Sequence, residues 1–182
     1  MILVVIPAKG SSSRLSGKNM LPLHGKPMLD YAIASARRSK RTDLIIVSTD
    51  SDKIADHAET MGVRVVRRGV ELGGDVPLFD VYKHAAEEVG LDDVEYLIGL
   101  QVDHPDRNVE VDDALAYFED QKADYMTSSE ADGTVNGSYK IYTNQMLKTN
   151  NAKKHVVLVD DCTNIHYQED LDKAVKVLME RG

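Results

Sequence analysis

Short apolar runs alternate along this chain with longer segments in which apolar residues recur every three or four positions. The runs are rich in β-branched residues, which is typical of strands buried on both faces of a parallel sheet. They lie at residues 2–7, 43–49, 63–68, 94–101 and 156–160. The segments with helical periodicity predict helices over residues 27–38, 51–62, 77–89, 109–119 and 168–179. Pro27 is expected at the first position of its helix, where a missing N–H costs nothing.

This alternation of strand and helix predicts an α/β fold: a three-layer α/β/α, doubly wound, mostly parallel, Rossmann-like sheet. No internal repeat, low-complexity tract or linker interrupts the sequence, so we expect a single domain over residues 1–182. The pattern weakens after residue 124, where residues 138–143 alternate as an edge strand or a strand of a mixed sheet would. The polar segment 128–136 is either an active-site loop or an ordinary surface loop.

The charge balance argues against a nucleic-acid partner, because 30 acidic residues outnumber 22 lysines and arginines and leave a net charge of −8. The apolar start MILVVIPA is too short to cross a bilayer and has no cationic region before it. We therefore expect a cytoplasmic protein without membrane contact. The single cysteine, Cys162, excludes an intramolecular disulfide and a cysteine-cluster metal site, and is expected to be an ordinary buried thiol.

The segment AKGSSSRLSGKN, residues 8–19, follows the first predicted strand directly. In an open α/β sheet ligands bind beyond the carboxyl ends of the strands, so this loop leaves the sheet at the ligand-binding edge. Its glycine and serines can turn backbone N–H groups toward an anion. It also carries three cations, Lys9, Arg14 and Lys18. Three positive charges in one loop suit a polyphosphate.

The common phosphate loops do not match this segment. A Walker loop has four residues between its first glycine and Gly-Lys, followed by Ser or Thr, whereas here six residues separate Gly10 from Gly17 and Asn19 follows Lys18. The dinucleotide fingerprint G-x-G-x-x-G is absent as well. Composition therefore leaves two interpretations open, a nucleotide site of another kind and a solvated polar loop.

The stretch IPAKGSSSRLSGKNMLPLHGKPML, residues 6–29, resembles the opening of the sugar-acid cytidylyltransferases, the N-acylneuraminate and CMP-KDO synthetase family. The pattern of that family is close to I-P-A-R-x-x-S-x-R-x-P-G-K-N, followed by G-K-P-[ML]. Three further segments are similar to it, at residues 45–66, 67–85 and 100–105, and weaker likenesses follow in NGSYKIY and NIHYQEDLDKA. The resemblance implies a nucleotidyltransferase fold, transfer of CMP from CTP to a hydroxyl of a sugar acid with release of pyrophosphate, Mg²⁺ as cofactor, and a homodimer.

The resemblance also assigns the phosphate-binding residues. Lys18 would contact the α-phosphate and the transition state, and Arg14 the β- and γ-phosphates. Ser12 and the backbone of Gly10 and Ser11 would complete the phosphate cradle. Fixed cations at these positions suit the charge that develops when a nucleophile attacks the α-phosphate in line with the leaving pyrophosphate.

The resemblance assigns further residues to the base and ribose. Asn19 would contact ribose or base, and Ala8 and Lys9 stand where the family reads the edge of cytosine. Lys9 replaces the usual arginine and so lacks its bidentate fork. Gly74 stands in the place of a serine, so only a backbone contact is expected there. Gln101 ends the predicted strand 94–101, at the edge where the nucleotide is expected.

Asp103 matches the metal aspartate of the KDO branch, and a carboxylate is a hard oxygen ligand suited to Mg²⁺. The alternative is an aspartate that caps the turn before Pro105. The two candidate carboxylates of a second family segment are replaced by Asn164 and His166. Histidine favours softer metals than Mg²⁺. Either metal binding relies on Asp103 with phosphates, or Asp160 or Asp161 compensates, or activity is reduced. His166 is interpretable as a metal ligand or as an ordinary buried or capping histidine.

The chain is shorter than the usual enzymes of this family, and the difference falls after residue 124. We expect residues 124–160 to form a reduced acceptor and dimerisation region. Four hypotheses remain open on the sequence: a Mg²⁺-dependent sugar-acid cytidylyltransferase; a nucleotidyltransferase of other base or acceptor; a nucleotide-binding module without catalysis; and a structural α/β domain. The fold alone does not choose among them.

Overall fold

The computed structural model describes residues 1–11, 15–73 and 76–181 of the chain. Its centre is a seven-stranded sheet in the order β5-β4-β1-β6-β8-β7-β9. Its strands are β1 (Ile2–Pro7), β4 (Leu44–Thr49), β5 (Arg64–Arg67), β6 (Tyr96–Gly99), β7 (Tyr125–Ser129), β8 (Val135–Thr143) and β9 (His155–Val159). A small separate ribbon pairs β2 (Pro22–Leu23) with β3 (Lys26–Pro27).

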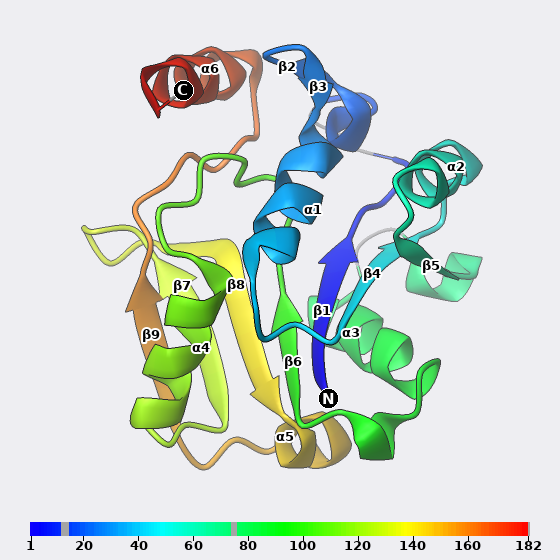
Figure 1. Cartoon of the computed structure of the whole chain (residues 1–182), viewed down its shortest axis with the longest axis vertical. Coiled ribbons are helices and arrows are strands. Elements are labelled where there is room, and N and C mark those ends of the chain that lie inside the picture. Colours follow the sequence, from blue (N-terminus) through cyan, green and yellow to red (C-terminus); the bar gives the residue numbers. More distant parts are fainter. Residues whose placement is uncertain (12–14, 74–75, 182) are drawn as a thin grey trace.

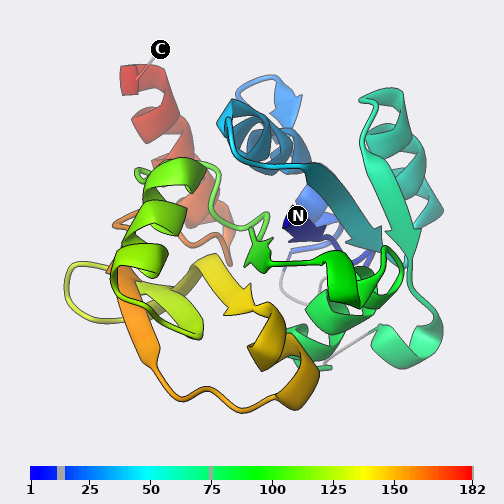
Figure 2. The same cartoon turned by 60° about the horizontal axis from the view of Figure 1, so that its bottom comes forward.

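Helices cover both faces of this sheet (Figure 1). They are α1 (Met28–Arg38), α2 (Asp52–Thr60), α3 (Leu78–Glu87), α4 (Val111–Asp120), α5 (Asn144–Thr149) and α6 (Gln168–Arg181), with 3-10 turns η1 (Lys18–Met20), η2 (Val70–Leu72) and η3 (Leu91–Asp93). Side chains from α1, α2, α4 and α6 share one apolar cluster, and those from α3 and α5 share the other. Figure 2 shows α5 at the end of β8, on the side of α3. The predicted three-layer α/β/α architecture is confirmed.

The central position of β1 in the sheet explains why its sequence is apolar without interruption. It pairs in parallel with β4 and with β6. Val4 and Ile6 pack into the cluster of α1 and α4, whereas Leu3 and Val5 pack into the cluster of α3. All four are 0% exposed, so both faces of the strand lie in the core and neither tolerates polar side chains.

The second half of the sheet differs from the prediction. β8 begins at Val135 and pairs antiparallel with both β6 and β7, so it lies inside a mixed sheet. Of the two predicted alternatives, the strand of a mixed sheet is confirmed and the edge strand is wrong. β7 and α5 were not predicted, and the segment 128–136 contains strand residues on both sides of a tight turn. The sequence of β7, YMTSS, is largely polar, and its buried Ser128 finds hydrogen-bond partners within the fold.

The other predicted elements are confirmed, with bounds that differ by at most two residues. One detail is wrong, because Pro27 is the N-cap of α1 rather than its first helical residue. Its backbone is extended, with φ −55° and ψ 144°, and it pairs with Pro22 in the β2–β3 ribbon. Among the described residues, no helix combines the length and the apolar character needed to cross a bilayer.

Candidate functional site

The loop after β1 remains tied to the neighbouring strand as it leaves the sheet. The N–H of Ala8 donates to the carbonyl of Ser48 over 2.9 Å, and the N–H of Gly10 donates to Asp50 Oδ1 over 2.7 Å. A Cβ at Gly10 would lie 2.7 Å from the Cβ of Ser51, so only glycine lets the loop approach the start of α2 this closely. The N–H of Gly10 is thus engaged by a carboxylate, and the side chain of Ala8 is fully buried.

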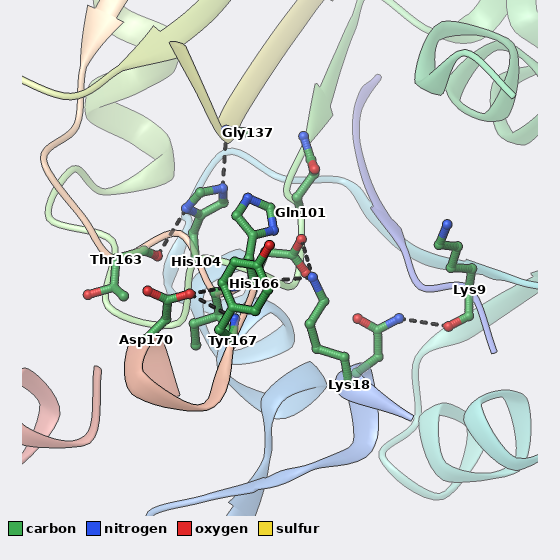
Figure 3. A network of polar contacts seen from close by, with 12 residues as sticks. Lys9, Lys18, Gln101, His104, Gly137, Thr163, His166, Tyr167 and Asp170 are labelled. Carbon is green, nitrogen blue, oxygen red and sulfur yellow. Dashed lines mark hydrogen bonds and ion pairs between the residues drawn. The ribbon is translucent and has the colours of Figure 1, made fainter. Parts of the chain in front are cut away.

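Lys18 is brought to the ligand-binding edge by a left-handed turn at Gly17, whose φ is 62°. Its ammonium lies 2.7 Å from Asp103 Oδ2, beyond the end of β6, and donates to the carbonyl of Ile165 over 2.9 Å (Figure 3). The side chains of Lys18 and Asp103 are only 12% and 20% exposed. Three segments distant in sequence therefore meet at one ammonium group, and two residues expected at the site form its central ion pair.

Asn19 supports the loop rather than facing outward. It is 7% exposed, and its Nδ2 donates to the carbonyl of Lys9 over 2.8 Å. The side chain of Lys9 points away from Lys18 (Figure 3). The amide of Asn19 thereby fixes the backbone that carries Lys9.

Gln101 lies where β6 has ended, and its side chain extends away from Lys18 (Figure 3). A Cβ on Gly137 of β8 would overlap the amide of Gln101, so the glycine leaves room for this side chain. The carbonyl of Gln101 accepts a hydrogen bond from Nη2 of Arg107. The side-chain amide of Gln101 therefore points toward β8 and away from Lys18.

Arg107 holds the loop that carries Gln101 and Asp103. It is 7% exposed, and besides its bond to Gln101 it donates to the carbonyls of His104, over 2.7 Å, and Ser138, over 3.0 Å. A guanidinium has five donors in a fixed fork, which suits it to holding several carbonyls at once. The loop after β6 is thus fastened to β8.

His104, in the same loop, is 1% exposed. Its Nε2 accepts from the N–H of Gly137 over 3.1 Å, and its Nδ1 pairs with the carbonyl of Thr163 over 3.1 Å. One ring nitrogen must accept and the other donate, so the imidazole is neutral. Burial, together with the nearby charge of Arg107, lowers the pKa of His104 to about 3.

The segment between β9 and α6 completes the site. Asp106 accepts from Thr163 through both its N–H, at 2.9 Å, and its hydroxyl, at 2.8 Å. The N–H of Ile165 donates to the carbonyl of Asp103 over 3.0 Å. The N–H of His166 is held by Asp170 Oδ2 at 2.8 Å. These bonds bring His166 to the site, next to the imidazole of His104 (Figure 3).

Asp160 and Asp161, the two aspartates before this segment, differ in their surroundings. Asp160 is 1% exposed and accepts from the N–H groups of Asn108 and Val109, at 2.9 and 3.1 Å, and from the hydroxyl of Ser138. Asp161 is exposed, and its charge adds to burial in raising the pKa of Glu130. The carboxylate of Asp160 thus accepts several hydrogen bonds within the fold, whereas the charge of Asp161 acts on Glu130.

The side chains around Lys18 that could ligate a metal ion restrict the kind of metal site that can form there. Within residues 1–11, 15–73 and 76–181, no group of three or more His, Cys, Asp or Glu side chains could hold a metal ion. Asp103 does present one partly exposed carboxylate at the site. Mg²⁺ keeps several waters and is commonly held by one or two carboxylates with substrate phosphates. The residues therefore fit Mg²⁺ bound through Asp103 and phosphate oxygens, and do not fit a cage built from protein ligands alone.

Three residues expected at the site, Ser12, Arg14 and Gly74, lie outside the described residues. Ser11 is described and exposed. Two residues that organise the site were missed from the sequence, His104 and Arg107. His104 contacts backbone groups of two other segments, and Arg107 contacts backbone groups of its own loop and of β8. Such contacts leave no local pattern in the sequence.

Comparison with known proteins adds independent information. The sequence profile of a family described as cytidylyltransferase matches residues 3–179. The 8-amino-3,8-dideoxy-manno-octulosonate cytidylyltransferase of Shewanella amazonensis is 35% identical over 104 residues, which is 57% of this chain and 41% of that protein. The protein of the same name from Shewanella piezotolerans is 29% identical over 161 residues, 88% of this chain and 60% of that one. The matches thus span less than two thirds of these relatives.

Solved structures share the fold. A CMP:2-keto-3-deoxy-manno-octonic acid synthetase complexed with CTP has a TM-score of 0.79 at 15% identity, covering 100% of this chain and 99% of that chain. A Mycobacterium tuberculosis protein solved with manganese has a TM-score of 0.68 at 16% identity, covering 96% and 98%. At these identities the likeness establishes the fold alone.

Proposed function

The chain belongs to the cytidylyltransferase family, and from that premise we propose that it transfers CMP from CTP to a hydroxyl of a sugar acid of the 3-deoxy-octulosonate kind. In this reaction the hydroxyl oxygen bonds to the α-phosphorus, the bond to the bridging oxygen of pyrophosphate breaks, and the hydroxyl proton is released. Two curated relatives carry the name of such an activity. Sialic acid is a second acceptor class that the proposal includes.

The ion pair of Lys18 and Asp103, 2.7 Å apart at the carboxyl edge, is the observation that carries the proposal. We assign Lys18 to the oxygens of the α-phosphate, where a fixed cation stabilises the charge of the transition state. We assign Asp103 to Mg²⁺, which would supply charge neutralisation of the triphosphate when bound. The nucleotide would therefore separate the two side chains, each taking a partner of opposite charge.

Most of the remaining nucleotide contacts keep their expected roles within the proposal, except Gly10 and Asn19, whose donor groups are already hydrogen-bonded within the protein. Arg14 and Ser12 would bind the β- and γ-phosphates, with the backbone of Ser11 beside them. The carbonyl of Ala8 and the ammonium of Lys9 would face the base. Asn19 would act mainly by holding the backbone of Lys9, since its amide already donates there. Gln101 and the backbone of Gly74 would border the nucleotide.

We further propose that residues 1–182 form one nucleotidyltransferase domain, with residues 124–160 as its reduced acceptor region, and that two copies associate. Coincident unfolding transitions by fluorescence and circular dichroism would support the single domain, and two separate transitions would contradict it. Sedimentation equilibrium at micromolar concentration would give twice the mass of 20.2 kDa for a dimer. A single species at the monomer mass would contradict association.

The decisive experiment is an assay of pyrophosphate release from CTP and Mg²⁺ with 3-deoxy-manno-octulosonate, its 8-amino analogue and N-acetylneuraminate as acceptors. We expect release with at least one of these acids and none without acceptor. A folded protein that binds CTP but releases no pyrophosphate with any of them would favour a nucleotide-binding module without catalysis. That alternative is supported by the absence, among the described residues, of any group of three or more His, Cys, Asp or Glu side chains that could hold a metal ion.

A further inference from the structure

A lysine on the sheet face that meets α3 has no acidic partner among residues 1–11, 15–73 and 76–181. Lys140 lies in β8 and is partly buried, and its Nζ donates to the hydroxyl of Tyr125 over 3.2 Å while lying 5.8 Å from the centroid of that ring. No carboxylate in the described part of the chain forms an ion pair with it. By contrast, Lys18 and Lys148 both have carboxylate partners. Withdrawing an ammonium from water is costly without an anion nearby, so this position favours a negatively charged ligand.

A buried hydroxyl without a partner lies on the same face. Tyr82 of α3 is 0% exposed, and its hydroxyl makes no hydrogen bond with any described residue. Such groups are rare in folded proteins, because each costs the full penalty of desolvation. Burial is the main cause of its raised pKa; the charge of Arg107 opposes this shift, and that of Asp103 adds to it. The hydroxyl therefore lies within electrostatic reach of the site.

The strand register brings Tyr82 and Lys140 together. Gly99 of β6 pairs directly with Lys140 of β8. Cβ positions of such antiparallel pairs are about 4.5–5.5 Å apart. The ring of Tyr82 fills the space that a side chain at Gly99 would occupy, because a Cβ there would overlap it. The phenol thus lies beside the stem of Lys140.

The loop after β6 leads from Gly99 to the nucleotide site. Gln101 lies two residues beyond Gly99, against Gly137 of β8, and its amide points away from Lys18 (Figure 3). Asp103 follows in the same loop. A ligand bound by Lys140 and Tyr82 would therefore lie next to a nucleotide bound by Lys18, with Gln101 between the two.

We propose that Lys140 binds the carboxylate of the acceptor and that the hydroxyls of Tyr82 and Tyr125 bind its sugar hydroxyls. This inference rests on the proposed function. A cation bonded to one phenol, with a second phenol beside its stem, matches a ligand that carries one carboxylate and several hydroxyls. It does not match the triphosphate, for which the loop after β1 provides the cations.

Calorimetry with 3-deoxy-manno-octulosonate tests this assignment, with the protein saturated by Mg²⁺ and a non-hydrolysable CTP analogue. In Lys140→Gln we expect the acid to bind about 10- to 100-fold more weakly, as loss of a charge-assisted hydrogen bond predicts. Lys140→Arg should recover part of the affinity, and the surface control Lys148→Gln should match the wild type. CTP affinity should be unchanged in all three variants.

The methyl ester of the same acid measures the contribution of the carboxylate to binding, because the ester carries no negative charge. The wild type should prefer the acid to the ester, and Lys140→Gln should bind both equally. Equal binding of acid and ester by the wild type would overturn the assignment of Lys140, as would unchanged binding of the acid by Lys140→Gln. A parallel loss of CTP affinity in Lys140→Gln would instead make the lysine a phosphate ligand, which also overturns it.

Tyr82→Phe separates a ligand contact from a packing role. Because the hydroxyl has no partner within the described residues, its removal should not lower the free energy of unfolding. We expect the acid to bind several-fold more weakly at unchanged stability, and unchanged affinity would overturn the role of Tyr82. If the wild type binds CTP but neither acid nor ester, this inference fails while nucleotide binding stands. If it does not bind CTP, the proposed function itself fails.

Discussion

Lys18 is held by two oxygens from segments far apart in sequence, the carboxylate of Asp103 and the carbonyl of Ile165. Each side chain of the ion pair thereby neutralises the charge that the other would offer to a ligand. Under the proposed roles, the affinity for nucleotide would depend on the affinity for metal, because a cation at Asp103 would release Lys18 toward phosphate.

Asp103→Asn tests this coupling. We expect turnover to fall on the order of 100-fold, since charge stabilisation in the transition state is lost. Without metal, CTP should bind more tightly than to the wild type, because Lys18 has lost its counter-ion. Assays of pyrophosphate release and calorimetry in a chelator measure the two effects. Asp113→Asn, at an exposed aspartate of α4, is the control and should change neither. Unimpaired turnover in Asp103→Asn would contradict the role of Asp103.

His104 makes the stability of the protein depend on pH. Its pKa is lowered to about 3 in the fold, compared with about 6.5 in an unfolded chain. Between these values the unfolded state binds a proton that the folded state does not, so stability is present above about pH 6.5 and is lost as the pH falls. The loss attributable to this residue is about 2 kcal/mol between pH 7 and pH 5.

Urea unfolding of the wild type and of His104→Gln at pH 7, 6 and 5 measures this contribution. Glutamine can still donate and accept but does not titrate. Between pH 7 and pH 5, the free energy of unfolding of the wild type should therefore fall by about 2 kcal/mol more than that of the variant. Parallel stability curves would show that His104 does not remain neutral in the fold.

At the scale of elements, the second half of the sheet depends on buried polar contacts as much as on apolar packing. The hydroxyl of Ser128 donates to Asn136 Oδ1 over 2.5 Å, and Nδ2 of Asn136 donates to the carbonyl of Asp160 over 3.0 Å. The carboxylate of Asp160 in turn accepts a hydrogen bond from the hydroxyl of Ser138. These bonds join β7, β8 and the end of β9, which explains how a polar strand sequence remains inside the sheet.

Asp160→Ala should destabilise the protein by about 2–4 kcal/mol, because it leaves the hydroxyl of Ser138 and two N–H groups without their acceptor. The neighbouring exposed Asp161 provides a matched control, and Asp161→Ala should change stability by less than about 0.5 kcal/mol. Urea unfolding at pH 7 gives both values. Similar effects from the two substitutions would contradict a structural role specific to Asp160.

At the scale of the whole molecule, the site lies where the loops after β1 and β6 and the segment before α6 meet, and ligand binding should therefore stabilise the entire fold. CTP at about 100 times its dissociation constant contributes about 2.7 kcal/mol. For a domain of this size we expect a rise in Tm of roughly 5–10 °C.

Thermal unfolding with CTP, UTP, ATP and GTP, each with and without Mg²⁺, measures this effect. The shift should be largest for CTP with Mg²⁺ and smaller when the metal is omitted. Equal shifts for all four nucleotides would contradict selection of cytosine, and they would agree with the replacement of the usual arginine by Lys9.

The periodicity of apolar residues determined the α/β architecture, because burial on both faces of β1 and on one face of each helix imposes a pattern readable in every short window. The glycine- and serine-rich segment after β1 likewise predicted a ligand-binding loop, since its position at the carboxyl edge follows from the parallel sheet. The likeness to a known family supplied Lys18 and Asp103 as site residues.

Only the tertiary structure decided which residues meet. The contact of Lys18 with Ile165, the bond of Arg107 to the carbonyl of Ser138 and the position of Tyr82 beside Lys140 join segments that are remote in sequence. The interior position of β8 also follows from its pairing rather than from its alternating residues. A local pattern records how each residue is buried, but backbone groups are chemically alike, so their distant partners are specified only when the chain has folded.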